Sequence, residues 1–195
     1  GKVSNAHKGQ FDGVSITTFA AGTLALYDWL NDNDEVAFLP VDVVNSPEVI
    51  ARNRTMITIN GALSVDLNGQ AVADTIGGRQ FSGIGGHEDF MAQSGLSLED
   101  RSLVCMPSIS VVDGVDISRI VPTLPEGWIV TTPRHQLDLV VTEHGVAPLR
   151  GRQVRERARA LADIAAPPLL AQLPRPPARR GSRPGRPPSA GRRPT

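Results

Sequence analysis

A glycine-rich segment followed by acidic residues is the part of this sequence best suited to chemistry. It spans residues 81–90 and reads FSGIGGHEDF. Glycine lets the backbone adopt positive φ angles and lets a ligand come close to bare N–H groups. N–H groups just ahead of a helix stabilise an anion or a developing oxyanion. We therefore predict an oxyanion-stabilising loop with Gly83, Gly85 and Gly86 as donors; for so short a motif taken alone, a structural turn is the alternative.

A second candidate lies in residues 137–147, LDLVVTEHGVA, where Glu143 follows an apolar run. Polar residues at strand ends often point into a cleft. A desolvated carboxylate in a cleft has a raised pKa and orients an acyl carboxylate, which is the role predicted for Glu143. The alternative is a salt bridge from Glu143 to Arg150 or Arg134. Together the two segments indicate acyl chemistry.

Three further sets of residues have ordinary structural alternatives. Asn45 precedes Ser46 and Pro47, a pattern typical of a helix N-cap. The sequence places His87, Glu88 and Asp89 together but lacks the His and Cys spacing of a metal site, so no metal is expected. Five arginines between positions 150 and 159 suit either the phosphates of a ligand or a solvated helix face, and the interleaved Glu156 favours the solvated face. They are Arg150, Arg152, Arg155, Arg157 and Arg159.

The amino-acid composition excludes several classes of protein. Of 195 residues, 40% are hydrophobic and only 4% aromatic, so the core is expected to be aliphatic. The formal net charge of zero conceals a division: residues 174–195 carry seven Arg and no acid, which leaves −7 on residues 1–173. An acidic body argues against nucleic-acid binding. The single Cys105 excludes an intramolecular disulfide and fits a reducing cytoplasm. No apolar run approaches the roughly 18 residues of a membrane span.

The elements expected to position these residues are short. Strands are predicted over residues 14–20, 36–39, 56–60, 63–67, 71–76, 103–106, 108–112, 117–121, 128–132 and 137–142, and helices over 24–30, 47–52, 88–93 and 152–164. Asn68 and Gly69 predict a two-residue hairpin between the strands at 63–67 and 71–76. The fold class is therefore α/β, with a mixed sheet flanked by helices.

The composition changes after Ala166, so two regions are expected: a domain over residues 1–166 and a tail over 167–195. The tail is rich in Pro and Arg without apolar periodicity, which predicts disorder. A basic, Pro-rich tail suits an acidic surface or a Pro-recognising module, whereas an unselected extension is the favoured interpretation.

An ordered series of motifs covering roughly residues 10–165 resembles the C-terminal domain of the acetyl-CoA hydrolase/transferase family, which includes acetate, succinate and 4-hydroxybutyrate CoA-transferases. The matching segments are GVSITTFAAG at 13–22, FLPVDVVNSP at 38–47, VDLNGQ at 65–70, GGRQFSGIGG at 77–86, ISRIVP at 117–122 and VTEHGVAPLRG at 141–151. A chance match of this length and order is improbable.

The resemblance implies a mechanism and a set of site residues. A glutamate attacks an acyl-CoA thioester, and a glutamyl-CoA thioester then passes CoA to a carboxylate or to water. Gly85 and Gly86 donate to the carbonyl oxygen, Glu143 supports the site, and Asn45, Asn60 and Gly83 contribute to substrate and CoA binding. The expected partners are acyl-CoA and a small carboxylate, with CoA as substrate carrier and no cofactor.

This chain departs from the family in two ways. The nucleophilic glutamate is expected roughly ten residues before Gly1, and the N-terminal half of the architecture is missing, so the chain is expected to be a fragment that needs that half or a second copy as its partner. Val112 stands where the family has a basic residue that helps hold CoA. The alternative function is therefore an inactive remnant or an interaction domain.

Overall fold

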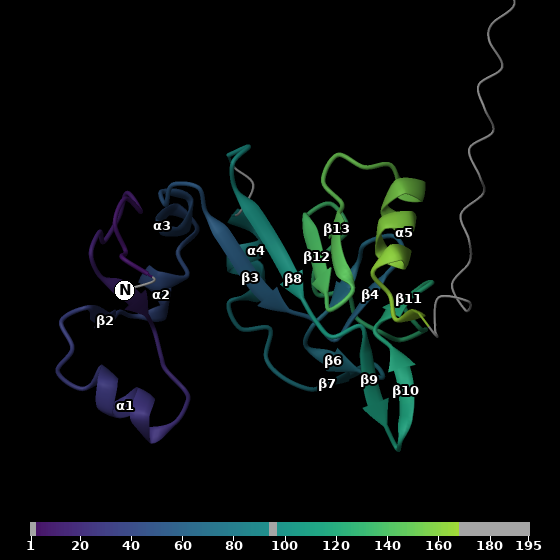
Figure 1. The fold of residues 1–195 in the computed structure, drawn as a ribbon, viewed down its shortest axis with the longest axis horizontal. Helices are drawn as coiled ribbons and strands as arrows, with labels where there is room; N and C mark the ends of the chain where they lie inside the picture. The colour runs from purple at the N-terminus through teal and green to yellow at the C-terminus, as the bar shows by residue number, and fades with distance from the viewer. Residues whose placement is uncertain (1–2, 94–96, 168–195) are drawn as a thin grey trace, which may run out of the picture.

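The computed structural model describes residues 3–93 and 97–167. Its centre is a mixed four-stranded sheet in the order β13-β12-β8-β3 (Figure 1). The strands β3 (Ile57–Gly61), β8 (Arg101–Cys105) and β12 (Leu139–Thr142) run parallel, and β13 (Gly145–Pro148) returns antiparallel to β12. The predicted α/β class with a mixed sheet is confirmed. The registers align Gly61, Cys105 and Val141, so the carboxyl ends of the parallel strands share one edge.

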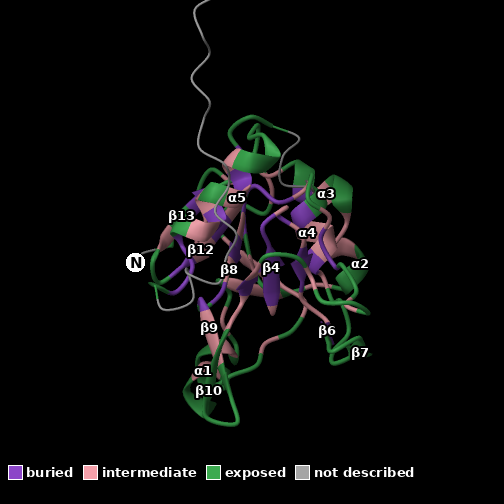
Figure 2. Cartoon of the chain, turned by 90° about the vertical axis from the view of Figure 1, so that its right-hand side faces the viewer, coloured by how far each residue is buried: buried purple, intermediate pink, exposed green. Residues whose placement is uncertain are grey.

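Two helices cover one face of this sheet. The helix α4 (His87–Gln93) packs against β3, and α5 (Val154–Asp163) packs against β13. Alternate strand residues point toward these helices and are buried, because side chains alternate between the two faces of a strand. The core they form with the helices includes Val104, Val140, Ala147, Met91, Leu161 and Ile164. Figure 2 shows this buried layer between the exposed outer surfaces.

A three-stranded sheet packs beside the first, in the order β11 (Ile120–Val121), β4 (Ser64–Asp66) and β5 (Ala71–Val72). The predicted hairpin forms at Asn68 and Gly69, but its turn has three residues, 67–69, and not the predicted two, because Val65 pairs with Ala71 and the Asp66 N–H donates to the Gln70 carbonyl. The buried carboxylate of Asp66 accepts hydrogen bonds from the backbone N–H groups of Asn68 and Gln70 and from both side-chain amides. Gly69 has a φ of +83°, a conformation that suits glycine.

Two small hairpins lie outside these sheets. The first, β6 (Thr75–Ile76) with β7 (Arg79–Gln80), leads directly into the glycine loop. The second, β9 (Ile109–Val112) with β10 (Val115–Ser118), projects from the body (Figure 1). The strand predicted over 128–132 is wrong: only Thr132 pairs, through a single bridge to Ala71, because the backbone there bends rather than extends along a neighbour.

The N-terminal segment forms a separate group of elements beyond the edge of β3, on the left in Figure 1. In it β1 (Ser15–Thr17) pairs in parallel with β2 (Val36–Phe38). The helix α1 (Leu24–Leu30) has no buried residue, while α3 (Pro47–Ala51) packs against α4. The short helix α2 (Val41–Val44) was not predicted from the sequence.

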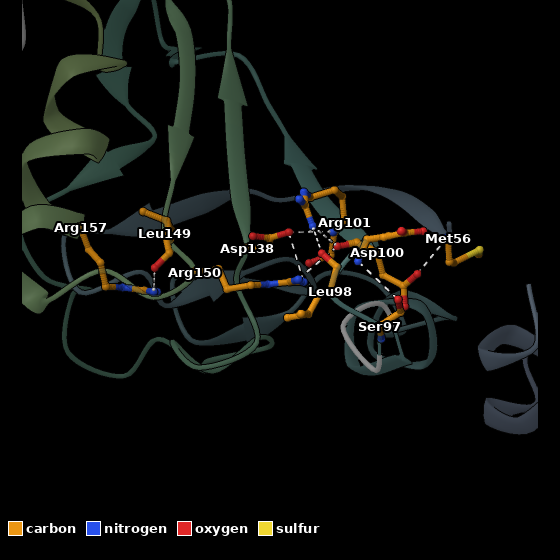
Figure 3. A network of polar contacts seen from close by, with 11 residues as sticks. Met56, Ser97, Leu98, Asp100, Arg101, Asp138, Leu149, Arg150 and Arg157 are labelled. Atoms are coloured by element: carbon orange, nitrogen blue, oxygen red, sulfur yellow. Dashed lines mark hydrogen bonds and ion pairs between the residues drawn. The ribbon is translucent and has the colours of Figure 1, made fainter. Parts of the chain in front are cut away.

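A polar network ties the strand starts together at the sheet edge opposite the aligned carboxyl ends (Figure 3). The Arg150 guanidinium lies 3.2 Å from the buried carboxylate of Asp138 and donates to the carbonyl of Asp100 at 3.1 Å. Arg157 is also buried, so the prediction of a solvated arginine face is wrong at this position. Its guanidinium donates to three backbone carbonyls, of Asn68, Leu149 and Arg134, which anchors α5 to the body.

No helix in residues 3–93 and 97–167 is long and apolar enough to cross a membrane. The predicted Pro- and Arg-rich tail lies, apart from Pro167, outside the described residues, and its boundary at residue 166 remains a prediction.

Candidate functional site

The glycine loop is exposed and is anchored at its start. Residues 81–85 are exposed, and Gly85 has a φ of +58° with no heavy atom near the position of a Cβ. The Asp74 carbonyl accepts hydrogen bonds from the N–H groups of Phe81 and Ser82. The Asp74 carboxylate in turn accepts from the Thr131 hydroxyl at 2.6 Å, which lowers the pKa of Asp74. The loop therefore presents its glycines to solvent from a fixed base.

The structure brings Asn45 and Gly86 into direct contact. A Cβ at Gly86 would lie 2.3 Å from the Asn45 Nδ2, so no side chain fits there without moving Asn45. The Asn45 amide donates to the Asp89 carboxylate at 2.9 Å, which fixes it against α4. The N-cap alternative for Asn45 is wrong, because Asn45 ends α2 and Ser46 occupies the N-cap position of α3.

The first turn of α4 is held by a residue that the sequence did not single out. Thr132 is fully buried and its hydroxyl donates to the Glu88 carboxylate at 2.5 Å. The His87 Nε2 lies 2.8 Å from the same hydroxyl, and burial lowers the pKa of His87. Since the Thr132 hydrogen is directed to Glu88, the hydroxyl oxygen accepts a hydrogen bond from the Nε2–H of His87. These bonds fix the helix that follows the glycine loop.

Asn60 lies near the carboxyl end of β3, the strand against which α4 packs. It is half-buried, and among the described residues its Nδ2 is a buried donor with no hydrogen-bond acceptor. Buried donors are normally paired, so this unpaired amide is an exception among the described residues. The substrate-binding role of Asn60 stays a prediction.

Glu143 follows β12 but differs from its predicted state. Its side chain is 48% exposed, and its carboxylate accepts from both the hydroxyl of Ser108, at 2.5 Å, and the backbone N–H of Ser108, at 2.9 Å. The Ser108 hydroxyl is the main cause that lowers the pKa of Glu143 to about 2. The expectation of a desolvated carboxyl with a raised pKa is therefore wrong.

Neither salt bridge predicted as an alternative for Glu143 is formed within residues 3–93 and 97–167. Arg150 pairs with Asp138 instead, and the Nε2 of the neighbouring His144 lies 3.5 Å from the Glu143 carboxylate. Ser108, which holds the Glu143 carboxylate, is fully buried. No local sequence pattern predicts the hydrogen bonds between Ser108 and Glu143, because 35 residues separate the two.

Replacing Ser108 by alanine should raise the pKa of Glu143 from about 2 towards its ordinary value of 4.5, because the hydroxyl that stabilises the ionised form is lost. A carboxyl-detected NMR titration of the two proteins measures the shift. Ser110→Ala, a half-buried serine on β9, is the matched control and should leave the Glu143 titration unchanged. A Glu143 midpoint that stays near 2 in Ser108→Ala would show that the hydroxyl is not the cause.

The predicted residues thus fall into two groups along one sheet edge. Gly86 and Asn45 touch, and α4 places them on the β3 side, where Asn60 also lies. Glu143 follows β12, two strands away, or about 10 Å between strand axes. No group of three His, Cys, Asp or Glu side chains in the described part of the chain is arranged to hold a metal. The arrangement offers exposed N–H donors, side-chain amides and the ionised carboxylate of Glu143.

Comparison with known proteins identifies the family to which this chain is similar. Residues 22–175 match the family described as the acetyl-CoA hydrolase/transferase C-terminal domain. The chain belongs to this family. The predicted family resemblance is thereby confirmed, and the family domain includes the glycine loop, Asn45 and Glu143.

Individual relatives agree with the assignment. The chain is similar to the 4-hydroxybutyrate coenzyme A transferase of Clostridium kluyveri, with 44% identity over 86% of this chain and 38% of the relative. It is 34% identical to an acetyl-CoA hydrolase of Neurospora crassa, over 70% of this chain and 25% of that protein. The crystal structure of RipA from Yersinia pestis superposes with a TM-score of 0.78 at 36% identity, covering 87% of this chain and 38% of RipA. The chain thus spans less than two fifths of the length of these relatives.

Proposed function

We propose that this chain supplies one side of the active site of an acyl-CoA transferase or acyl-CoA hydrolase that works through a glutamyl-CoA thioester. The observation that carries the proposal is the contact between Gly86 and Asn45 beside an exposed glycine loop. Bare N–H donors and a fixed amide lie together where a thioester carbonyl can approach. The family relatives that are named as CoA transferases and acetyl-CoA hydrolases support the reaction class.

In the proposed reaction a glutamate carboxylate from the part of the polypeptide outside this chain attacks the thioester carbonyl. The carbon–sulfur bond breaks, leaving an acyl-glutamyl anhydride and the CoA thiolate. The thiolate then attacks the glutamyl carbonyl, which forms glutamyl-CoA and releases the first carboxylate. An acceptor carboxylate reverses these steps to give a new acyl-CoA, or water releases free CoA. No metal or redox cofactor is required.

Each step places negative charge on a carbonyl oxygen. The N–H groups of Gly85 and Gly86 are the donors proposed for this oxygen, with Gly83 giving the loop its close approach to CoA. Asn45 and Asn60 are proposed to bind the acyl or CoA portion through their amides. Donors fixed before the reaction avoid reorganisation as the charge develops, and the bonds of Asp74 and Thr132 hold the loop and α4 in this way.

The role proposed for Glu143 follows from its ionised state. With a pKa of about 2 it donates no proton at neutral pH and repels the carboxylate of an acyl group. Its free lone pairs suit a donor instead, such as an amide N–H of CoA or a water molecule.

Val112, exposed at the end of β9 where the family has a basic residue, supplies no charge to CoA phosphates. We also propose that the enzyme acts in the cytoplasm on acyl-CoA and a small carboxylate.

The test uses a completed polypeptide, in which this chain replaces the matched stretch of the Clostridium kluyveri transferase. We expect it to turn over acetyl-CoA with 4-hydroxybutyrate as acceptor, and we expect the isolated chain to show background activity only. Hydroxylamine should inactivate the completed polypeptide in the presence of acyl-CoA, since it cleaves glutamyl thioesters. A folded completed polypeptide without turnover would contradict the proposal and leave the alternative of an inactive interaction domain.

A further inference from the structure

Thr131 and Thr132 are adjacent buried threonines that are fixed against the end of β5. The backbone N–H groups of both residues donate to the Ala71 carbonyl, at 2.9 and 3.1 Å, and the Thr132 carbonyl accepts from the Ala71 N–H at 3.0 Å. As in a β-bulge, two residues oppose one, an arrangement that redirects side chains. The two hydroxyls are therefore presented from a rigid base.

The Thr131 hydroxyl holds the residue that supports the start of the glycine loop. It accepts from the backbone N–H of Ala73 at 2.9 Å and donates to the Asp74 carboxylate at 2.6 Å. The Asp74 carbonyl in turn accepts from the N–H groups of Phe81 and Ser82, at 2.8 and 3.2 Å. Loss of the Thr131 hydroxyl would therefore release Asp74 and, with it, the first two residues of the loop.

The Thr132 hydroxyl holds the residues that follow the loop. It donates to the Glu88 carboxylate at 2.5 Å, and its oxygen accepts from the His87 Nε2–H at 2.8 Å. His87 and Glu88 are the first two residues of α4, directly after Gly86. Their side chains are only 9% and 27% exposed, so water competes little for these hydrogen bonds. The position of Gly86 is thereby tied to Thr132.

We propose that Thr131 and Thr132 act together as a threonine clamp that positions the oxyanion donors, with Thr131 fixing the start of the glycine loop and Thr132 fixing its end. Both are positioning residues, because each acts through another residue. The inference rests on the proposed function for the role of the loop. It adds the side chains that determine where the loop donors lie.

The clamp predicts that the two threonines are coupled. Residues 81–85 are exposed, so packing in the core does not hold this part of the loop. A loop that is fixed at both ends loses its position when either end is released, and releasing the second end then changes little more. The effects of removing the two hydroxyls should therefore not add.

Thr131→Val and Thr132→Val replace each hydroxyl by a methyl group of similar size. Each change should lower the kcat of the completed polypeptide by about tenfold or more while the KM for acetyl-CoA stays within about twofold. The double variant should have a kcat within about threefold of the weaker single variant, whereas independent effects would multiply to about 100-fold.

Two further variants distinguish positioning from a general loss of stability. Thr132→Ser restores the hydroxyl without the methyl group and should recover most of the kcat. Ser64→Ala is the matched control, because Ser64 is 2% exposed and its hydroxyl donates to the Arg119 carbonyl at 2.9 Å. It removes a buried hydrogen bond elsewhere in the molecule, so it should lower the melting temperature and leave kcat unchanged.

Backbone order in the glycine loop gives a readout that requires no turnover. In the isolated chain, the ¹⁵N order parameters of Gly83, Gly85 and Gly86 should fall by about 0.2 or more in either valine variant, towards the range of flexible backbone. Ser64→Ala should leave these order parameters unchanged. Circular dichroism of each variant checks that the chain remains folded.

Three results would overturn the inference. The first is unchanged order parameters in the folded valine variants. The second is a kcat in an active completed polypeptide that falls no further than in Ser64→Ala. The third is a double variant whose loss equals the product of the single losses. A completed polypeptide without turnover while both threonines are intact would contradict the proposed function instead, and the order parameters would still decide whether the two threonines position the loop.

Discussion

Gly86→Ala should lower the kcat/KM of the completed polypeptide by about 100-fold or more, the range seen when one oxyanion donor is lost. The new methyl group would lie 2.3 Å from the Asn45 Nδ2 and 3.4 Å from the Phe90 ring, so Asn45 must leave its bond to Asp89 or the loop must move. Either change separates the amide from the N–H donors. Steady-state kinetics with acetyl-CoA measures the loss.

Substitutions at the neighbouring Gly83 and Gly85 distinguish the effect of a steric clash from the effect of backbone strain. At Gly83 a Cβ meets no atom closer than 4.0 Å and φ is not positive, so Gly83→Ala introduces neither a clash nor backbone strain; its loss of kcat/KM reflects only the approach to CoA and should be smaller than that of Gly86→Ala. At Gly85 there is open space but φ is +58°, so alanine there introduces strain of about 1 kcal/mol without a clash. If Gly86→Ala is no more damaging than Gly83→Ala, then the contact with Asn45 has no part in catalysis.

Arg157→Ala should lower the free energy of unfolding of the isolated chain by about 3–5 kcal/mol. The guanidinium donates to the carbonyls of Leu149 at 2.9 Å, Asn68 at 3.1 Å and Arg134 at 2.6 Å, and the side chain is only 8% exposed. Alanine leaves these carbonyls without their donor and opens a cavity beside Gly69. Urea unfolding followed by circular dichroism measures the change.

Two further variants test whether the loss of stability comes from the buried guanidinium of Arg157. Arg155→Ala removes an exposed arginine from the same helix and should cost less than about 0.5 kcal/mol. Arg157→Lys retains the charge but replaces the planar guanidinium by one ammonium group, so it should recover only part of the stability. Equal stability of Arg157→Ala and Arg155→Ala would show that the buried hydrogen bonds contribute little.

The sequence predicted the elements whose signals are local. The Asn68–Gly69 turn, the helical spacing of residues 152–164 and the apolar strands at 56–60 and 137–142 all formed where expected, because each is determined by neighbouring residues. The glycine loop was also found from local composition. Asn45 entered the candidate site only through the family motif, and the structure supplies its physical reason in the contact with Gly86.

The errors arose where the partner is distant in sequence. Nothing near Glu143 indicates that Ser108 will hold its carboxylate, and burial alone predicted the opposite pKa direction. Arg157 has charged neighbours typical of a solvated face, yet three carbonyls from separate loops surround it. Thr132 sits in a segment predicted as a strand, while its hydroxyl holds the first turn of α4. Such pairings depend on the tertiary fold.

The central claim is that this chain supplies donors to a thioester whose attacking glutamate lies outside it. The most direct measurement is peptide mapping of the completed polypeptide after incubation with acetyl-CoA and rapid acid quenching. We predict a CoA adduct on a glutamate of the portion that precedes this chain, which borohydride reduces to an alcohol, and no adduct on Glu143 or Glu88. An adduct on either of these two glutamates, in an active enzyme, would contradict the account.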